Sequence, residues 1–112
     1  MLYIDGARLG YALAAPDNDV TLPDMARLCD AFYIGGTKVG ALFGEAVVVL
    51  NKEIHMTRGS IKNRGGLLAK GWLLGIQFDT LFTDNLYLKL AKNGVDQAMR
   101  LRKAIEEKCY HI

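Results

Sequence analysis

Asp5 and Lys38 are the side chains whose types and positions best suggest chemistry. Asp5 directly follows a short apolar run at residues 2–4, and Lys38 follows a second run at residues 31–34 and a double glycine. Open α/β sheets bind their ligands beyond the carboxyl ends of the parallel strands. If the two runs form neighbouring parallel strands, the carboxylate and the amine meet over one edge of the sheet.

This pair of groups is what pyridoxal phosphate chemistry requires. A lysine amine forms a Schiff base with the cofactor's aldehyde, and a carboxylate keeps the pyridine nitrogen protonated, so that the ring accepts electrons released at the substrate's α-carbon. Arg8 could hold a substrate carboxylate or the ring hydroxyl through its planar guanidinium group. Gly35 and Gly36 would let a ligand approach the backbone closely.

Three apolar runs predict the strands that position these groups. Residues 2–4 are typical of a strand buried on both faces, and we expect them to form a central parallel strand. Residues 31–34 predict a second strand, parallel to the first and next to it. A helix between them completes a βαβ unit. Residues 46–50 follow Lys38 after a glycine-rich link that is too short for a crossover helix, which predicts an antiparallel third strand.

Three further stretches predict helices. A capping box at Thr21 and Asp24 begins the first helix, which we expect to end near Cys29. Apolar residues recur at helical spacing over residues 67–82. They recur again over residues 85–108, where charged residues occupy the opposite face of the helix.

Each candidate residue also has an ordinary explanation. A lysine at a strand end is usually a solvated charge, Asp5 could cap the following turn, and Arg8 could form an exposed ion pair of little energy with it. Their joint placement at two consecutive strand ends favours the chemical interpretation. His55 and His111 have no Cys, Asp or Glu at ligand spacing, so no metal site is predicted.

Composition limits the class of protein. The 112 residues are 51% hydrophobic and 23% charged, which is typical of one compact domain. A formal charge of +2 argues against a nucleic-acid partner, and the apolar runs are far shorter than the roughly 20 residues that span a bilayer. The N-terminus does not resemble a signal peptide. Cys29 and Cys109 are too few and too far apart for a disulfide framework, so we expect a cytoplasmic protein. We also expect Cys29 to be buried and Trp72 to lie in the core or an interface.

Three stretches resemble a known family. Residues 2–10 (LYIDGARLG), 33–41 (YIGGTKVGA) and 64–71 (RGGLLAKG) resemble the low-specificity threonine aldolases. These enzymes belong to the aromatic amino acid β-eliminating lyase group of fold-type I pyridoxal phosphate enzymes. The resemblance implies an α/β fold with parallel strands, one antiparallel strand and C-terminal helices. Residues 1–112 would then form a single partial domain, the second half of the large cofactor-binding domain.

The resemblance implies a role for each residue near the two strand ends. Lys38 corresponds to the Schiff-base lysine and Asp5 to the partner of the pyridine nitrogen. Arg8 corresponds to a contact with the substrate carboxylate or the ring oxygen. Thr37 resembles a residue that contacts the phosphate or positions the lysine.

A basic segment falls where the family binds phosphate, often across a dimer interface. Arg64 is the residue that we place in the cofactor site, and Lys62 and Lys70 lie in the same segment. A solvated basic face explains all three residues equally well. Many relatives carry Met-Arg-Gln after the double glycine, but residues 67–70 here read LLAK, so the phosphate ligand among the three stays open.

By this resemblance, the parent enzyme would be a homodimer or homotetramer that cleaves threonine-like β-hydroxy-α-amino acids to glycine and an aldehyde. The family's phosphate loop, its stacking ring and a second carboxylate-binding arginine have no counterpart in these residues, so we expect the chain alone to be inactive. Two alternatives are a related lyase that eliminates a β-substituent with the same lysine and aspartate, and a truncated, non-catalytic module.

Overall fold

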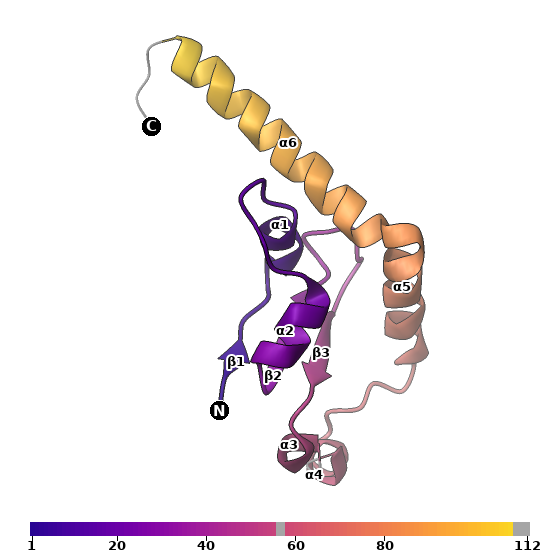
Figure 1. The fold of residues 1–112 in the computed structure, drawn as a ribbon. Helices are drawn as coiled ribbons and strands as arrows, with labels where there is room; N and C mark the ends of the chain where they lie inside the picture. The colour runs from indigo at the N-terminus through magenta and orange to yellow at the C-terminus, as the bar shows by residue number, and fades with distance from the viewer. Residues whose placement is uncertain (56–57, 109–112) are drawn as a thin grey trace.

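The computed structural model describes residues 1–55 and 58–108, which form a three-stranded sheet with helices (Figure 1). Mixed α/β structure is the class that the sequence predicts. The elements in chain order are β1 (Tyr3–Ile4), α1 (Leu9–Leu13), α2 (Leu22–Leu28), β2 (Ala31–Gly35), β3 (Glu45–Val49), α3 (Lys52–His55), α4 (Arg58–Asn63), α5 (Trp72–Phe82), the 3-10 helix η1 (Thr83–Asn85) and α6 (Leu86–Glu107).

Strand β2 is the middle strand of the sheet. β1 pairs parallel with it, with Tyr3 opposite Ala31, and β3 pairs antiparallel, with Glu45 opposite Gly35. The predicted strand directions are therefore confirmed. The carboxyl ends of β1 and β2 and the first residue of β3 meet at one edge of the sheet.

One face of the sheet carries the core, and the other face is open. Phe32 and Ile34 of β2 are buried on the core face together with the following residues: Leu9, Met25, Cys29, Val39, Ala41, Leu81, Tyr87 and Ala91. On the other face, Tyr3 is 56% and Val47 is 64% exposed. The prediction that β1 is a central strand buried on both faces is therefore wrong. β1 is an outer strand of this sheet, and other elements pack against only one face of the sheet.

The first predicted helix is confirmed as α2. Thr21 and Asp24 form the reciprocal capping box that the sequence indicates, with Pro23 inside the first turn. Cys29 ends this helix and is buried, as expected. The capping groups satisfy backbone N–H groups that the first turn of a helix leaves without partners.

The helix predicted over residues 67–82 is shorter than expected. α5 begins at Trp72, directly after Gly71 at its N-cap, and glycine lowers helix propensity. Trp72 is 62% exposed, so it does not lie in the core of the described chain, and its place in an interface stays a prediction. The spacing of its apolar residues identified α5 as a helix without showing which side would find a partner.

The last predicted helix is confirmed as α6, which follows a break at Asp84 and Asn85. Asp84 and Asn85 have φ values of 51° and 57°, so the backbone adopts a left-handed conformation at these two residues between α5 and α6. Tyr87 and Ala91 pack into the core near the start of α6. Farther along, the helix extends beyond the sheet (Figure 1), and Leu101 on its predicted apolar face is exposed.

Three helices have no counterpart in the prediction. α1, α3 and α4 have five, four and six residues. Elements this short do not complete enough turns to show helical periodicity. Of the helices in the described parts of the chain, none is at once long and apolar enough to cross a membrane.

Candidate functional site

The structure brings Asp5 and Lys38 to the same edge of the sheet. The pKa of the Asp5 carboxyl lies below its ordinary value of 3.8, mainly because the Tyr33 hydroxyl and then the Ala7 N–H donate hydrogen bonds to it. The positive charges of Lys38 and Arg8 lower this pKa further. Arg8 directly precedes α1, and Lys38 follows β2 by three residues, so both cations come from chain segments at this end of the sheet.

Two glycines let the ends of β1 and β2 touch. The Gly35 N–H donates to the Gly6 carbonyl oxygen at 2.8 Å. A Cβ atom on Gly6 would lie 1.7 Å from the Tyr33 carbonyl oxygen, and one on Gly35 would lie 2.2 Å from the Ala7 carbonyl oxygen. Only glycine fits at these two positions, and the close contact holds the Asp5 segment against the strand that leads to Lys38.

Asp5 uses one of its oxygens to fix its own position. The Ala7 N–H donates to Oδ1 at 3.0 Å, which closes a local turn, and the Tyr33 hydroxyl donates to the same oxygen. The ordinary explanation of Asp5 as a turn cap is therefore also correct. Oδ2 makes no hydrogen bond within residues 1–55 and 58–108, so it can accept one from a ligand.

Tyr33 belongs to this site, although sequence reasoning did not identify it. The hydrogen bond to Asp5 raises the pKa of the Tyr33 hydroxyl to about 12, so this phenol keeps its proton and acts as a donor. The alternation of strand side chains could have found it, because residues 33 and 35 face the same side of β2. Its proximity to Asp5 depends on the pairing of β1 with β2.

Lys38 and Thr37 lie in a tight turn just after β2. The N–H groups of Val39 and Ala41 both donate to the Gly36 carbonyl oxygen, at 2.9 and 3.0 Å. Val39 and Ala41 are buried, whereas Thr37 and Lys38 are exposed. The turn therefore anchors its apolar residues in the core and leaves the polar pair accessible.

Arg64 is not brought to this edge. β3 runs away from the Asp5 and Lys38 end and stops at Val49 opposite Ala31, and α3 and α4 follow beyond that opposite end (Figure 1). Arg64 comes just after α4 and is exposed, as is Lys62. Within one copy of the described chain, these basic residues do not join Asp5 and Lys38.

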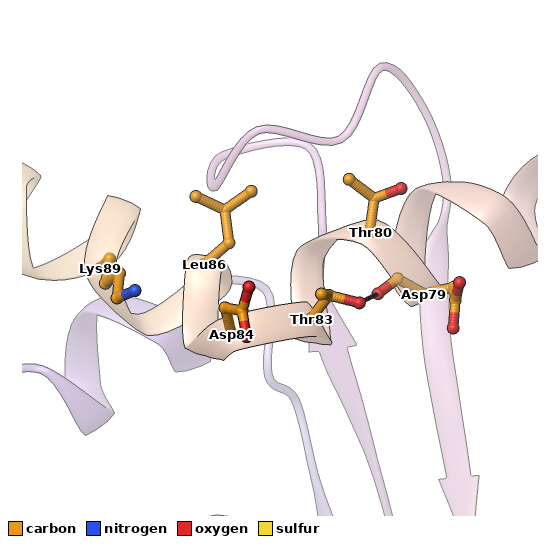
Figure 2. Close-up of a pocket in the computed structure, with 6 residues that line it drawn as sticks. All are labelled: Asp79, Thr80, Thr83, Asp84, Leu86 and Lys89. Carbon is orange, nitrogen blue, oxygen red and sulfur yellow. Dashed lines mark hydrogen bonds between the residues drawn. The ribbon is translucent and has the colours of Figure 1, made fainter.

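A separate hollow lies at the corner between α5 and α6. Figure 2 shows the six residues that line it, with the Thr83 hydroxyl donating to the Asp79 carbonyl oxygen at 2.8 Å. None of the residues predicted for chemistry is among these six. His111, Cys109 and the side chain of His55 lie outside what the structure describes.

The structure is an α/β module in which an acid and an amine follow two parallel neighbouring strands at the same end of the sheet. No family model matches the chain, and no curated protein matches it either. Among solved structures, the chain is similar to Leishmania major threonine aldolase, with 51% sequence identity and a TM-score of 0.88 over 94% of its own length. It spans 31% of the length of that protein. The predicted resemblance is confirmed, and the chain corresponds to a fragment of a threonine aldolase-like protein.

Proposed function

We propose that this chain is the segment of a pyridoxal phosphate-dependent aldolase that carries the cofactor-binding lysine, Lys38, and the acid for the pyridine nitrogen, Asp5. The whole enzyme would cleave threonine-like β-hydroxy-α-amino acids to glycine and an aldehyde. One observation carries this proposal: Asp5 and Lys38 share a sheet edge, and the charge of Lys38 contributes to the lowered pKa of Asp5. Residues 1–112 would form the second half of a fold-type I large domain.

The residues at this edge fit the cofactor chemically. Lys38 is exposed and makes no ion pair in the described chain, so its amine is accessible to an aldehyde. The lowered pKa keeps Asp5 ionised at neutral pH, and its Oδ2 is available to a protonated ring nitrogen. When bound, the cofactor supplies a ring that delocalises the electrons left at the α-carbon as the Cα–Cβ bond breaks.

The neighbours of Lys38 and Asp5 have supporting roles in this proposal. Arg8 directly precedes α1 and is exposed, so its guanidinium group is available to bind the substrate carboxylate or the ring oxygen. The Thr37 hydroxyl lies 3.4 Å from Oε1 of Glu45, which favours a role in positioning Lys38 over one in binding phosphate.

Arg64 could bind the cofactor's phosphate only from a second copy. It lies beyond the opposite end of the sheet from Asp5 and Lys38, so a contact inside one chain would require a different arrangement. We therefore propose that Arg64 acts across an interface in the oligomeric parent.

We expect the isolated chain to bind the cofactor weakly and to be inactive. It spans 31% of the threonine aldolase that it matches. One face of its sheet is open, with Tyr3 and Val47 more than half exposed. Small losses of alignment at a reacting centre cost rate steeply, about a hundredfold for roughly 1 Å.

Reductive trapping tests the proposal despite weak binding. The chain is mixed with pyridoxal phosphate and reduced with borohydride, and the labelled lysines are located by mass spectrometry. We expect Lys38 to be labelled about tenfold faster than Lys89 and Lys103, which are also exposed. Asp5→Asn should reduce this preference, because it removes the anion that holds the ring nitrogen. Equal labelling of all lysines would overturn the proposal.

A product assay separates the proposed aldolase from a β-eliminating lyase. In any preparation with turnover, glycine plus an aldehyde supports the aldolase, whereas pyruvate plus ammonia supports the lyase. Preferential labelling of Lys38 without turnover agrees with our expectation for the isolated chain.

A further inference from the structure

We infer that Glu45, Tyr11 and Tyr87 are positioning residues for Lys38. They come from three different elements, β3, α1 and α6, and each forms a hydrogen bond with the stretch of residues 35–38. This inference rests on the proposed function, since exact placement of the lysine matters only if its amine reacts.

The first two contacts hold the end of β2. The Tyr87 hydroxyl is buried and donates to the Gly35 carbonyl oxygen at 2.9 Å. Glu45 Oε2 accepts from the Gly36 N–H at 2.6 Å, and its Oε1 lies 3.4 Å from the Thr37 hydroxyl. A hydrogen bond from a backbone N–H to a charged carboxylate is stronger than one between neutral groups.

The third contact holds the lysine's own backbone. The Tyr11 hydroxyl donates to the Lys38 carbonyl oxygen. The Tyr11 ring is in turn packed against α6, where a Cβ atom on Gly94 would lie 2.9 Å from it. On the same helix as Tyr11, Gly10 lies against the Tyr87 ring at a similarly short distance of 2.9 Å from an added Cβ. The two tyrosines therefore belong to one packed unit of α1 and α6.

Residues 39–43, which follow Lys38, are also held by other elements. Val39 and Ala41 are buried in the core. Gln77 of α5 accepts from the N–H groups of Leu42 and Phe43 at 2.7 and 3.3 Å, and its amide donates to the Phe43 carbonyl oxygen at 3.3 Å. The backbone on both sides of Lys38 is thus tied to other elements, while the lysine side chain stays exposed.

This arrangement assigns a physical role to the three contacts. With its backbone fixed, the Lys38 amine can reach only the positions that its own side-chain rotations allow. Reaction rates depend steeply on such placement, and supporting hydrogen bonds provide it. The three residues act through Lys38 and need no contact with the cofactor.

Tyrosine variants provide the first test. Tyr11→Phe removes the hydroxyl that holds Lys38, and Tyr3→Phe is the matched control, since Tyr3 lies on β1 and has no such contact with residues 35–38 in the described chain. Trapping with pyridoxal phosphate is followed at Lys38 and, in the same molecule, at Lys103. We expect Tyr11→Phe to slow labelling of Lys38 about threefold to tenfold at saturating cofactor, and to leave labelling of Lys103 unchanged.

Glu45 variants provide the second test. Glu45→Ala removes the acceptor of the Gly36 N–H, whereas Glu45→Gln keeps an oxygen there. We expect Glu45→Ala to slow Lys38 labelling about threefold to tenfold and to speed hydrogen exchange of the Gly36 amide, and Glu45→Gln to restore both. If Glu45→Ala does not fold, the Gln and Tyr11→Phe variants decide.

The outcomes separate the inference from the proposed function. If the wild-type chain shows no preferential labelling of Lys38, the proposed function fails, and the inference fails with it. If the wild type shows the preference and Tyr11→Phe matches Tyr3→Phe, only the positioning role is overturned. If Glu45→Gln restores protection of the Gly36 amide from hydrogen exchange without restoring the labelling of Lys38, the role of Glu45 is overturned.

Discussion

The two ends of the sheet differ in how the chain around them is held. At the Gly35 end, residues 36–44 are tied to β3, α1 and α5 by side-chain hydrogen bonds. At the Val49 end, residues 59–70 are exposed throughout, and an added Cβ on Gly59 or Gly65 would meet no atom within 4 Å. The backbone around Lys38 is held in place because several elements converge on it, whereas Lys62 and Arg64 at the Val49 end are surrounded by solvent.

Glycine substitution should give the largest contrast between the two ends. Gly6→Ala would place a Cβ atom 1.7 Å from a backbone oxygen, so we expect a loss of about 3 kcal/mol or more in the free energy of unfolding, or failure to fold. Gly59→Ala in α4 should be neutral or stabilise by about 0.5–1 kcal/mol. Urea denaturation measures both, and a loss below about 1 kcal/mol for Gly6→Ala would contradict the contact between the two strand ends.

Removing a buried hydroxyl should have the next largest effect. Tyr87→Phe deletes the hydrogen bond to the Gly35 carbonyl oxygen, and we expect a loss of about 1–2 kcal/mol in unfolding free energy. Tyr3→Phe, on the open face, should change stability by less than about 0.5 kcal/mol. Equal effects of the two substitutions would show that the tie at the Gly35 end contributes nothing.

The pKa of Asp5 depends on contacts at the Gly35 end of the sheet. Its pKa is lowered mainly by the Tyr33 hydroxyl, so Tyr33→Phe should raise it toward the ordinary value of 3.8. With a lowered folded-state pKa, Asp5 stabilises the fold above pH 3.8, and this stabilisation is lost as the pH falls through the lowered value. Tyr33→Phe should therefore reduce this acid-range contribution.

NMR titration of the carboxyl carbons measures this change. Asp24 is the internal control, since its lowered pKa comes mainly from Thr21 and should stay low in Tyr33→Phe. An unmoved pKa at Asp5 would show that the phenol does not hold the carboxylate.

The smallest effect is expected from the basic segment. Arg64→Ala should leave unfolding free energy within about 0.5 kcal/mol and should not change Lys38 labelling in dilute solution. A slower labelling of Lys38 in the dilute chain would contradict the separation of the two ends. A decrease in Lys38 labelling that grows with protein concentration would agree with the role that we propose for Arg64 across an interface.

Local patterns were sufficient for much of the fold. The capping box at Thr21, the directions of the three strands and the long helix α6 follow from turn residues, link lengths and apolar spacing. The same patterns did not show which faces would be covered, as the exposed side chains of Tyr3 and Trp72 demonstrate. Burial depends on which elements become neighbours, and apolar spacing within one element does not contain that information.

The sequence by itself identified Asp5 and Lys38 as the candidate acid and amine, since each follows an apolar strand with glycines beside it. The tertiary structure alone decided what holds them. Tyr11 reaches Lys38 across 27 positions, and Tyr87 reaches Gly35 across 52. Hydrogen bonds over such separations depend on helices packing against the ends of strands, and no local spacing of residue types specifies that packing.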